Sequence, residues 1–264
     1  MNQLTVTPKW LKENLNHPDL IILDASKSEN GNAQIQGAIA FDIKNKFSDT
    51  NSKFPNTLLN EKDFEIACQQ IGINQNSIIV VYDNIGIYNS PRVWWMFKTM
   101  GFQHIYVLDG GLPLWIYQEN PTEKINKPTF KKGNFKAQLD SEKVKDYKFI
   151  KSNIKTQGFL IIDARSEGRF NGTAPEPRAG LASGNIPKSI NIPFKGVLNE
   201  NVFKSKKELE IIFDELKNNK LPLVFSCGSG ITACIVLMAY QMVLNNEISV
   251  YDGSWTEWAI LEQL

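Results

Sequence analysis

One segment of the chain has the sequence Leu221-Pro222-Leu223-Val224-Phe225-Ser226-Cys227-Gly228-Ser229-Gly230-Ile231-Thr232, and the helical run Cys234–Leu244 follows it. Its apolar residues Leu221–Phe225 are typical of a short buried strand. A cysteine at the end of such a strand, with two glycines before a helix, lies on a tight turn whose N–H groups face one point. The helix N-terminus adds positive potential there. We therefore expect the loop to stabilise the Cys227 thiolate and to make it a nucleophile.

The residues around this cysteine exclude several other chemistries. A phosphatase loop of the cysteine type carries arginine six residues after its cysteine, and here that residue is Ala233. A cysteine protease needs a histidine base, and the chain has only His17 and His104. A nucleotide-binding P-loop needs lysine after its last glycine, where this chain has Ile231. Zinc needs about four clustered ligands, and the three cysteines are not spaced for such a site.

Length, charge and cysteine content set broader limits. A chain of 264 residues is long enough for two domains or one large one. Its net charge of +1, from 29 basic and 28 acidic residues, favours neither a nucleic-acid nor a membrane partner. Three cysteines make no disulfide framework, which favours a reducing compartment. The first residues lack the pattern of a secretion signal, and no apolar run is long enough for a membrane span. We therefore expect a cytoplasmic protein.

The chain contains two copies of one sequence pattern. The matching pairs, in chain order, are Leu20–Ser26 with Leu160–Ser166, Ser77–Asp83 with Leu221–Cys227, Ile105–Gly111 with Ile248–Ser254, and Trp115 with Trp258. The matches keep their order and a nearly constant spacing, which indicates a duplicated domain. We predict domains at 1–118 and 147–264, joined by a linker at 119–146 that is rich in Lys, Pro, Asn and Thr.

Each copy alternates short apolar strands with amphipathic helices. Apolar residues fall at helical spacing in two stretches, at Phe64, Ala67, Cys68 and Ile71 and at Leu209, Ile212, Phe213 and Leu216. This alternation predicts an α/β fold of three layers in each domain, with a mostly parallel central sheet flanked by helices. Ligands on such sheets bind at the carboxyl ends of the strands. Cys227 lies there in the second copy and Asp83 in the first, so the second copy alone carries the nucleophile.

Several motifs of the chain resemble those of the two-domain rhodanese-type sulfurtransferases, over nearly its whole length. The motifs are Ser90–Phe97, Leu108–Gly111, Asp163–Arg165, Gly168–Phe170, Glu176–Arg178, Ile192–Phe194 and Cys227–Ala233. The resemblance implies two tandem rhodanese-like domains, of which the first is catalytically silent and the second carries the persulfide cysteine. That expectation agrees with the contrast between Asp83 and Cys227.

The loop sequence also resembles one branch of that family. Members that prefer thiosulfate have Cys-Arg-Lys-Gly, in which two cations meet a dianion. Members that prefer 3-mercaptopyruvate have Cys-Gly-Ser-Gly, as in this chain. Mercaptopyruvate carries one carboxylate, which residues outside the loop can bind. Arg169 and Arg178 match the substrate-binding arginines of the family, and the planar guanidinium meets a carboxylate with two parallel hydrogen bonds.

The resemblance implies a mechanism that needs no metal and no cofactor. Arg169 and Arg178 would orient the 2-oxo acid, Cys227 would take its sulfur as a persulfide, and pyruvate would leave. Ser229 would hydrogen-bond the sulfur or relay a proton. A thiol such as thioredoxin or glutathione, or cyanide, would accept the sulfur. The loop residues expected to surround the persulfide with their N–H groups are Gly228, Gly230, Ile231 and Thr232.

Two alternatives stay open at this point. A thiosulfate sulfurtransferase is the nearest, and Gly228 and Ser229 in place of loop cations disfavour it. The other is a sulfur carrier or binding module without turnover, in which Arg169 and Arg178 would have no small substrate to hold. Cys234 and Cys68 are interpreted as core residues on helices.

The chain departs from the mercaptopyruvate pattern at two positions of the first half. Relatives of that type often have an aspartate and a histidine that form a relay with the loop serine. The positions that match them here are Lys44 and Asn56. Ser229 is therefore expected to act without a histidine.

Overall fold

The computed structural model describes residues 3–26, 33–126 and 129–264. They form two compact units. The first contains the chain up to Asp49 with 58–140 and 201–203, and the second contains 50–57, 141–200 and 204–264. The segment Thr50–Thr57 thus belongs to the second unit although first-unit residues flank it in the sequence.

The first unit is built on a parallel sheet. Among the described residues this sheet has five strands, in the order β1 (Thr5–Val6), β6 (Ile105–Leu108), β5 (Ile78–Tyr82), β2 (Leu20–Asp24) and β4 (Ala38–Ala40). Every neighbouring pair is parallel. A separate antiparallel pair joins β3 (Ala33–Ile35) to β7 (Thr122–Lys124). The strand β12 (Val202–Phe203) also belongs to this unit.

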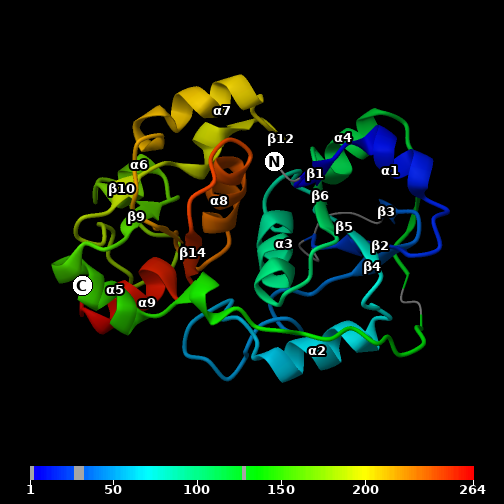
Figure 1. Ribbon diagram of the computed structural model, residues 1–264, viewed down its shortest axis with the longest axis horizontal. Helices are drawn as coiled ribbons and strands as arrows, with labels where there is room; N and C mark the ends of the chain where they lie inside the picture. The colour runs from blue at the N-terminus through cyan, green and yellow to red at the C-terminus, as the bar shows by residue number, and fades with distance from the viewer. Residues whose placement is uncertain (1–2, 27–32, 127–128) are drawn as a thin grey trace. The chain divides into compact units, whose positions relative to one another are not determined.

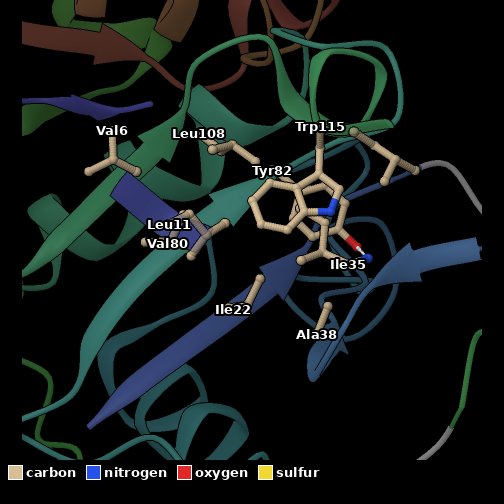
Figure 2. Close-up of a cluster of buried hydrophobic side chains, with 10 residues drawn as sticks. Val6, Leu11, Ile22, Ile35, Ala38, Val80, Tyr82, Leu108 and Trp115 are labelled. Atoms are coloured by element: carbon tan, nitrogen blue, oxygen red, sulfur yellow. Dashed lines mark hydrogen bonds between the residues drawn. The ribbon is translucent and has the colours of Figure 1, made fainter. Parts of the chain in front are cut away.

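Helices cover both faces of this sheet. They are α1 (Pro8–Asn14), α2 (Glu61–Gln70), α3 (Ser90–Thr99) and α4 (Gly111–Tyr117). On one face Leu11 of α1 and Trp115 of α4 pack with strand residues such as Val80, and Figure 2 shows this apolar cluster. On the other face Phe64 of α2 meets Phe97 of α3, with ring centroids 5.1 Å apart. The first unit therefore has the three layers that the sequence predicts.

The described part of the predicted linker, 119–146, packs against the first unit as far as Asp140. The N–H of Gly133 donates to the carbonyl of Gln69 at 2.8 Å, and the N–H of Phe135 donates to Ile73 at 3.1 Å. Phe135 is fully buried. The domain boundaries at 118 and 147 stay a prediction, and these contacts describe where the chain beyond 118 lies.

The second unit repeats the sheet of the first. In the described chain it has five parallel strands, in the order β8 (Val144–Lys145), β14 (Ile248–Tyr251), β13 (Leu223–Ser226), β9 (Leu160–Asp163) and β10 (Ile190–Asn191). This is the order of the first sheet, strand for strand. The predicted duplication is therefore a duplication of topology.

Helices again cover both faces. They are α5 (Tyr147–Thr156), α6 (Glu167–Phe170), α7 (Lys206–Ile212), α8 (Ala233–Gln241) and α9 (Ser254–Leu261), visible in Figure 1. Ile150 of α5 and Trp255 of α9 share one core with Val224 of β13. Tyr240 of α8 packs on Phe213, beyond the end of α7, with ring centroids 5.3 Å apart. The short elements of this unit are η1 (Ser141–Lys143), η2 (Phe194–Val197), η3 (Asp214–Leu216) and β11 (Leu198–Asn199).

Local sequence signals explain where several helices begin. Thr7 precedes α1 and its hydroxyl accepts from the N–H of Trp10, and proline occupies the first turn. Asn60 and Asp146 accept in the same way before α2 and α5. Ser205 and Glu208 form a reciprocal capping box before α7.

Two boundaries differ from the sequence prediction. The strand predicted at Leu221–Phe225 is β13, Leu223–Ser226, because Pro222 has no N–H for a sheet and Leu221 is 40% exposed. The helical run Cys234–Leu244 is α8, which ends at Gln241. The N–H of Met242 is shared between the carbonyls of Met238 and Ala239, and that of Val243 donates three residues back, to Tyr240. No helix within the described residues has the length and apolar character to span a bilayer.

Candidate active site

The predicted nucleophile, Cys227, follows β13 directly and begins the loop that leads into α8. β13 is the middle strand of the second sheet, so Cys227 lies at the carboxyl end of a central strand. The residue is 1% exposed and its thiol is free. This is the place where parallel α/β sheets bind their ligands.

The turn that begins α9 holds this loop from one side. Ser254 Oγ accepts from the N–H groups of Cys227 and Gly230, at 3.2 and 3.1 Å, and donates to the carbonyl of Tyr251. The N–H of Trp255 donates to the Cys227 carbonyl at 2.9 Å. The first N–H groups of a helix have no partner inside it, and α9 uses those of Trp255 and Thr256 to hold the loop backbone.

Thr256 binds the next residue of the loop. Its N–H and its hydroxyl both donate to the carbonyl oxygen of Gly228, at 3.1 and 2.6 Å. The loop is therefore anchored through its carbonyl groups. The N–H of Gly230, one of the groups expected to surround a persulfide, donates to Ser254 Oγ.

Ile231 and Thr232 join the loop to α8. Their carbonyl groups accept from the N–H groups of Cys234 and Ile235, both at 3.2 Å. The C=O and N–H of one trans peptide point in opposite directions. The N–H groups of Thr232 and Ala233 therefore point out of the amino end of α8, where an anion is favoured.

Ser229 contacts a residue from far away in the sequence. The side-chain nitrogen Nδ2 of Asn56 donates to the carbonyl oxygen of Ser229 at 3.1 Å and to its Oγ at 3.0 Å. Asn56 belongs to the segment Thr50–Thr57 of the same compact unit. One of the two positions at which the chain departs from the mercaptopyruvate pattern thus lies against the loop serine. The other, Lys44, is exposed and belongs to the first unit.

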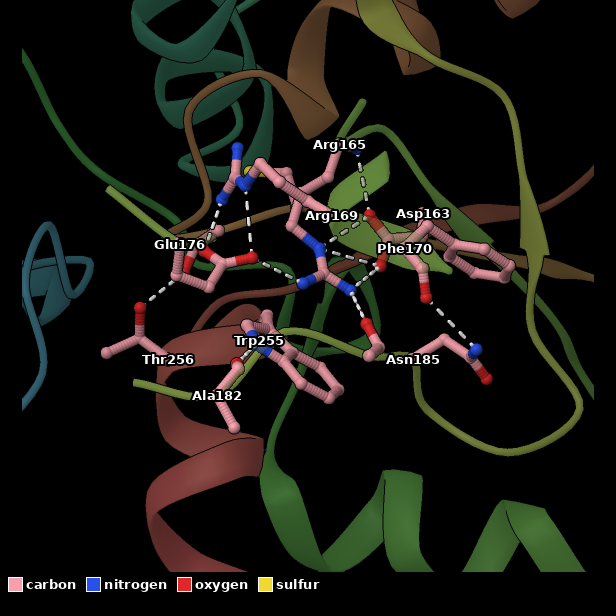
Figure 3. Close-up of polar contacts among 12 residues, drawn as sticks. Asp163, Arg165, Arg169, Phe170, Glu176, Ala182, Asn185, Trp255 and Thr256 are labelled. Carbon is pink, nitrogen blue, oxygen red and sulfur yellow. Dashed lines mark hydrogen bonds and ion pairs between the residues drawn. The ribbon is translucent and has the colours of Figure 1, made fainter. Parts of the chain in front are cut away.

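A buried cluster of two arginines and two carboxylates lies beside the loop. Arg165 donates through Nε and Nη2 to Asp163, and through Nη1 to Glu176 at 2.8 Å. Arg169 donates to both oxygens of Glu176, at 3.0 and 2.6 Å. Figure 3 shows the Glu176 carboxylate between the two guanidinium groups. The four charges sum to zero, which is the condition under which proteins tolerate such burial.

Arg165 also ties this cluster to the α9 side of the site. Its Nη2 donates to the carbonyl of Gly184 at 2.6 Å. Its guanidinium lies over the ring of Trp255, 4.2 Å from the centroid, as Figure 3 shows. Arg165 is fully buried, so its role is to position its neighbours.

Arg169 is the member of the cluster that reaches the loop. Its side chain is 20% exposed, and a Cβ at position 228 would lie 2.8 Å from its Nη2. A side chain at 228 would therefore require the Arg169 guanidinium to shift.

Arg178 reaches the same glycine through another residue. Its Nη1 donates at 3.0 Å to the hydroxyl of Thr256, which in turn binds the Gly228 carbonyl. Arg178 is exposed, in contrast to Arg165. Both predicted substrate arginines are thus linked to Gly228. Arg169 lies next to it, and Arg178 is connected to its carbonyl through the Thr256 hydroxyl.

The other cysteines are in the core, as the helical spacing predicts. Burial raises the pKa of the Cys68 thiol well above its ordinary value, which keeps it protonated. Cys234 is fully buried in α8, and its thiol donates to the carbonyl of Gly230 at 3.4 Å.

Three residues of the site have no role in the sequence prediction. They are Ser254, Thr256 and Glu176. The repeat contains a signal for one of them, because Ser254 stands where the first copy has Gly111. Both residues have positive φ, 53° and 50°. A serine in a conformation suited to glycine suggests that its hydroxyl is needed.

Comparisons with known proteins agree with this architecture. The family profile described as the rhodanese-like domain matches residues 7–118 and 146–261. The mouse 3-mercaptopyruvate sulfurtransferase is 38% identical, over 98% of this chain and 92% of its own. The rat thiosulfate sulfurtransferase is 37% identical, over 96% of this chain and 91% of its own.

A solved structure extends the agreement to the fold. The crystal structure of SseA from Escherichia coli, described as a 3-mercaptopyruvate sulfotransferase, superposes with a TM-score of 0.85 at 31% identity. The match covers 96% of this chain and 99% of that one. The chain belongs to the rhodanese-like family, among its two-domain sulfurtransferases.

Proposed function

We propose that the protein moves a sulfur atom from 3-mercaptopyruvate to a thiol or cyanide through a persulfide on Cys227, releasing pyruvate. The assignment of 3-mercaptopyruvate as the donor rests on the neutral loop together with Arg169. Positions 228 to 232 bear no charged side chain, and the nearest cation, Arg169, is fixed by Glu176 against Gly228. This arrangement suits a donor with one carboxylate better than a compact dianion.

The first half-reaction forms the persulfide. The Cys227 thiolate attacks the thiol sulfur of mercaptopyruvate, the S–S bond forms, and the bond between sulfur and carbon breaks. The electrons of that bond go to the carbon as the enolate of pyruvate, which then takes a proton. The N–H groups at the amino end of α8 and the hydroxyl of Ser229 stabilise the charge on sulfur.

Arginines orient the donor during this step. Glu176 holds the Nε and Nη2 of Arg169, so the Nη1 side of the guanidinium faces a substrate carboxylate. Arg178 is exposed and is held by Thr256. A carboxylate or keto oxygen bound by these groups would bring the donor sulfur over the loop.

The second half-reaction returns the enzyme from the persulfide to the free Cys227 thiolate. A thiolate acceptor attacks the outer sulfur, a new S–S bond forms, and the electrons of the Cys227–sulfur bond regenerate its thiolate. Thioredoxin and glutathione are the proposed acceptors. A reducing compartment such as the cytoplasm suits this chemistry, and all three cysteines are free thiols.

Thiosulfate is the second candidate donor, because a thiosulfate sulfurtransferase is 37% identical to this chain. The contact of Arg169 with Gly228 disfavours it. A cationic side chain at 228 would meet Arg169 with both a steric clash and like charge. A carrier without turnover is the remaining alternative.

The test is the ratio of kcat/KM for 3-mercaptopyruvate and thiosulfate, with cyanide and a dithiol as acceptors. We expect a preference for mercaptopyruvate of at least about tenfold, the discrimination of one well-placed charged contact, and one pyruvate for each sulfur transferred. A preference for thiosulfate would overturn the donor assignment. Turnover with neither donor would move the protein to the carrier class.

A further inference from the structure

The contact between Asn56 and Ser229 has a fixed polarity. A carbonyl oxygen accepts hydrogen bonds and cannot donate them. The Asn56 side-chain atom at 3.1 Å from the Ser229 carbonyl must therefore be the amide nitrogen, Nδ2, and not its oxygen. The same nitrogen lies 3.0 Å from Ser229 Oγ. Because an amide nitrogen only donates, Ser229 Oγ is the acceptor in this bond.

The polarity decides what the serine hydroxyl can do. One lone pair of Ser229 Oγ is occupied by Asn56, and the hydroxyl proton must go to a different acceptor. The carboxamide has no basic nitrogen, so Asn56 cannot take the serine proton. Both histidines of the chain, His17 and His104, belong to the other compact unit.

The segment that carries Asn56 is itself ordered by local bonds. The hydroxyl of Thr57 donates to the carbonyl of Phe54 at 3.0 Å, and its oxygen is hydrogen-bonded to Ser52 Oγ at 2.7 Å. Asn56 has φ of 60°, a left-handed conformation that asparagine tolerates better than most residues. The turn therefore presents the amide to the loop in one orientation.

We propose that Asn56 is a positioning residue that holds Ser229 as a hydrogen-bond donor to the reacting sulfur, in a pair that does not titrate. The hydroxyl then stabilises negative charge on sulfur in both half-reactions and relays no proton through Asn56. This inference rests on the proposed function, because it assigns the serine a role in that reaction.

The experiment compares three replacements of Asn56. Asn56→Gly keeps the left-handed backbone and removes the amide. Asn56→Asp keeps the shape but places a carboxylate against the Ser229 carbonyl and draws the serine proton to itself. We expect kcat for pyruvate release to fall about tenfold in the glycine variant, as one hydrogen bond is lost, and further in the aspartate variant. KM for the donor should change less than kcat in both.

Asn56→His replaces the amide with a group that titrates. Histidine accepts the serine proton when neutral and only donates when charged. We expect its pH–rate profile to gain a step near pH 6.5, the ordinary value for histidine, which the wild type lacks. The charged side chains whose contacts reach the loop are Arg169 at Gly228, Glu176 through Arg169, and Arg178 through Thr256.

Two controls keep the test decisive. Gln157→Gly removes a side-chain amide at another left-handed position, φ 50°, in the same unit; Gln157 is exposed, and its loss should leave kcat unchanged. In a Ser229→Ala background, Asn56→Gly should have no further effect, because Asn56 acts through the serine hydroxyl.

The outcomes separate the two hypotheses. Wild-type kcat in both Asn56→Gly and Asn56→Asp, or losses that add to those of Ser229→Ala, would overturn the positioning role while sulfur transfer stands. A wild-type protein without turnover, or an active Cys227→Ser variant, would overturn the proposed function itself. Melting temperatures report whether a variant has lost its fold, and the double-variant comparison is made among folded proteins only.

Discussion

Each unit has its own five-stranded sheet, and the two units place different side chains at the equivalent point of these sheets. In the first unit Asp83 follows β5, and in the second Cys227 follows β13, the middle strand in each case. The Asp83 carboxylate is fully buried and is surrounded by donors from its own loop. These donors are the N–H groups of Ile85, Tyr88, Asn89 and Ser90, at 2.9 to 3.0 Å, and the Ser90 hydroxyl at 2.8 Å.

The difference shows what the turn between strand and helix does in this fold. Its N–H groups converge at the amino end of a helix and so stabilise one negative charge. In the first unit the group that accepts from these donors is the carboxylate of Asp83. The second unit has the Cys227 thiol at this point, which the proposed mechanism uses as a thiolate. In that proposal a silent and an active site share one backbone pattern.

The support behind the two loops shares one backbone bond and differs in the residues around it. The N–H of Leu112 donates to the Asp83 carbonyl at 3.0 Å, as that of Trp255 does to Cys227 at 2.9 Å. The residue just before is Gly111 in the first unit and Ser254 in the second. A Cβ on Gly111 would lie 2.5 Å from the Asp83 carbonyl oxygen. The second unit accepts a left-handed serine because its hydroxyl binds two loop N–H groups.

The largest expected effect comes from making the second loop resemble the first. Cys227→Asp should abolish sulfur transfer, because a carboxylate cannot form a persulfide. It should nevertheless melt close to Cys227→Ser, since the loop stabilises negative charge. Steady-state assays and thermal unfolding measure the two properties. An aspartate variant that melts far below the serine variant would contradict the shared anion site. Cys68→Ala is the control and should retain transfer.

The next largest effect concerns Asp83 and the loop that follows β5 in the first unit. Asp83→Ala leaves the donors of that loop without their acceptor in a buried place. We expect a loss of about 3 kcal/mol in the free energy of unfolding of the first unit, with kcat of the folded protein unchanged. Chemical denaturation at pH 7 measures the stability. A variant as stable as wild type would mean that the carboxylate is not what orders the loop.

The smallest effect concerns Ser254. Ser254→Ala keeps the Cβ and removes the hydroxyl that accepts from Cys227 and Gly230, which should lower kcat about tenfold through a loosened loop. Ser254→Gly, the residue of the first unit, should lower kcat similarly while relieving about 1 kcal/mol of backbone strain. The measurement is kcat beside melting temperature. Equal kcat in the wild type, Ser254→Ala and Ser254→Gly would show that the backbone bonds of α9 hold the loop without the serine hydroxyl.

Much of this molecule follows from local patterns in the sequence. The apolar runs at Ile78–Tyr82 and Leu221–Phe225, the helical spacing around Phe64, and the repeat predict the strands, the helices and their parallel order. The placement of Cys227 at a strand end follows from the same patterns. They are local because burial on a sheet or a helix imposes a fixed period on neighbouring residues.

Cys227 follows its strand directly, and the glycines of its loop come within the next three residues. The nucleophile could therefore be predicted from one continuous stretch of sequence. The bond of Asn56 to Ser229 joins residues 173 positions apart in the chain. The bonds of Ser254 to the loop span 27 and 24 positions, and those of Glu176 to Arg165 and Arg169 span 11 and 7. Such bonds depend on which segments the fold brings side by side, and no spacing in the sequence encodes that. The sequence by itself therefore determined where the nucleophile lies, and only the tertiary structure determined which residues hold its loop.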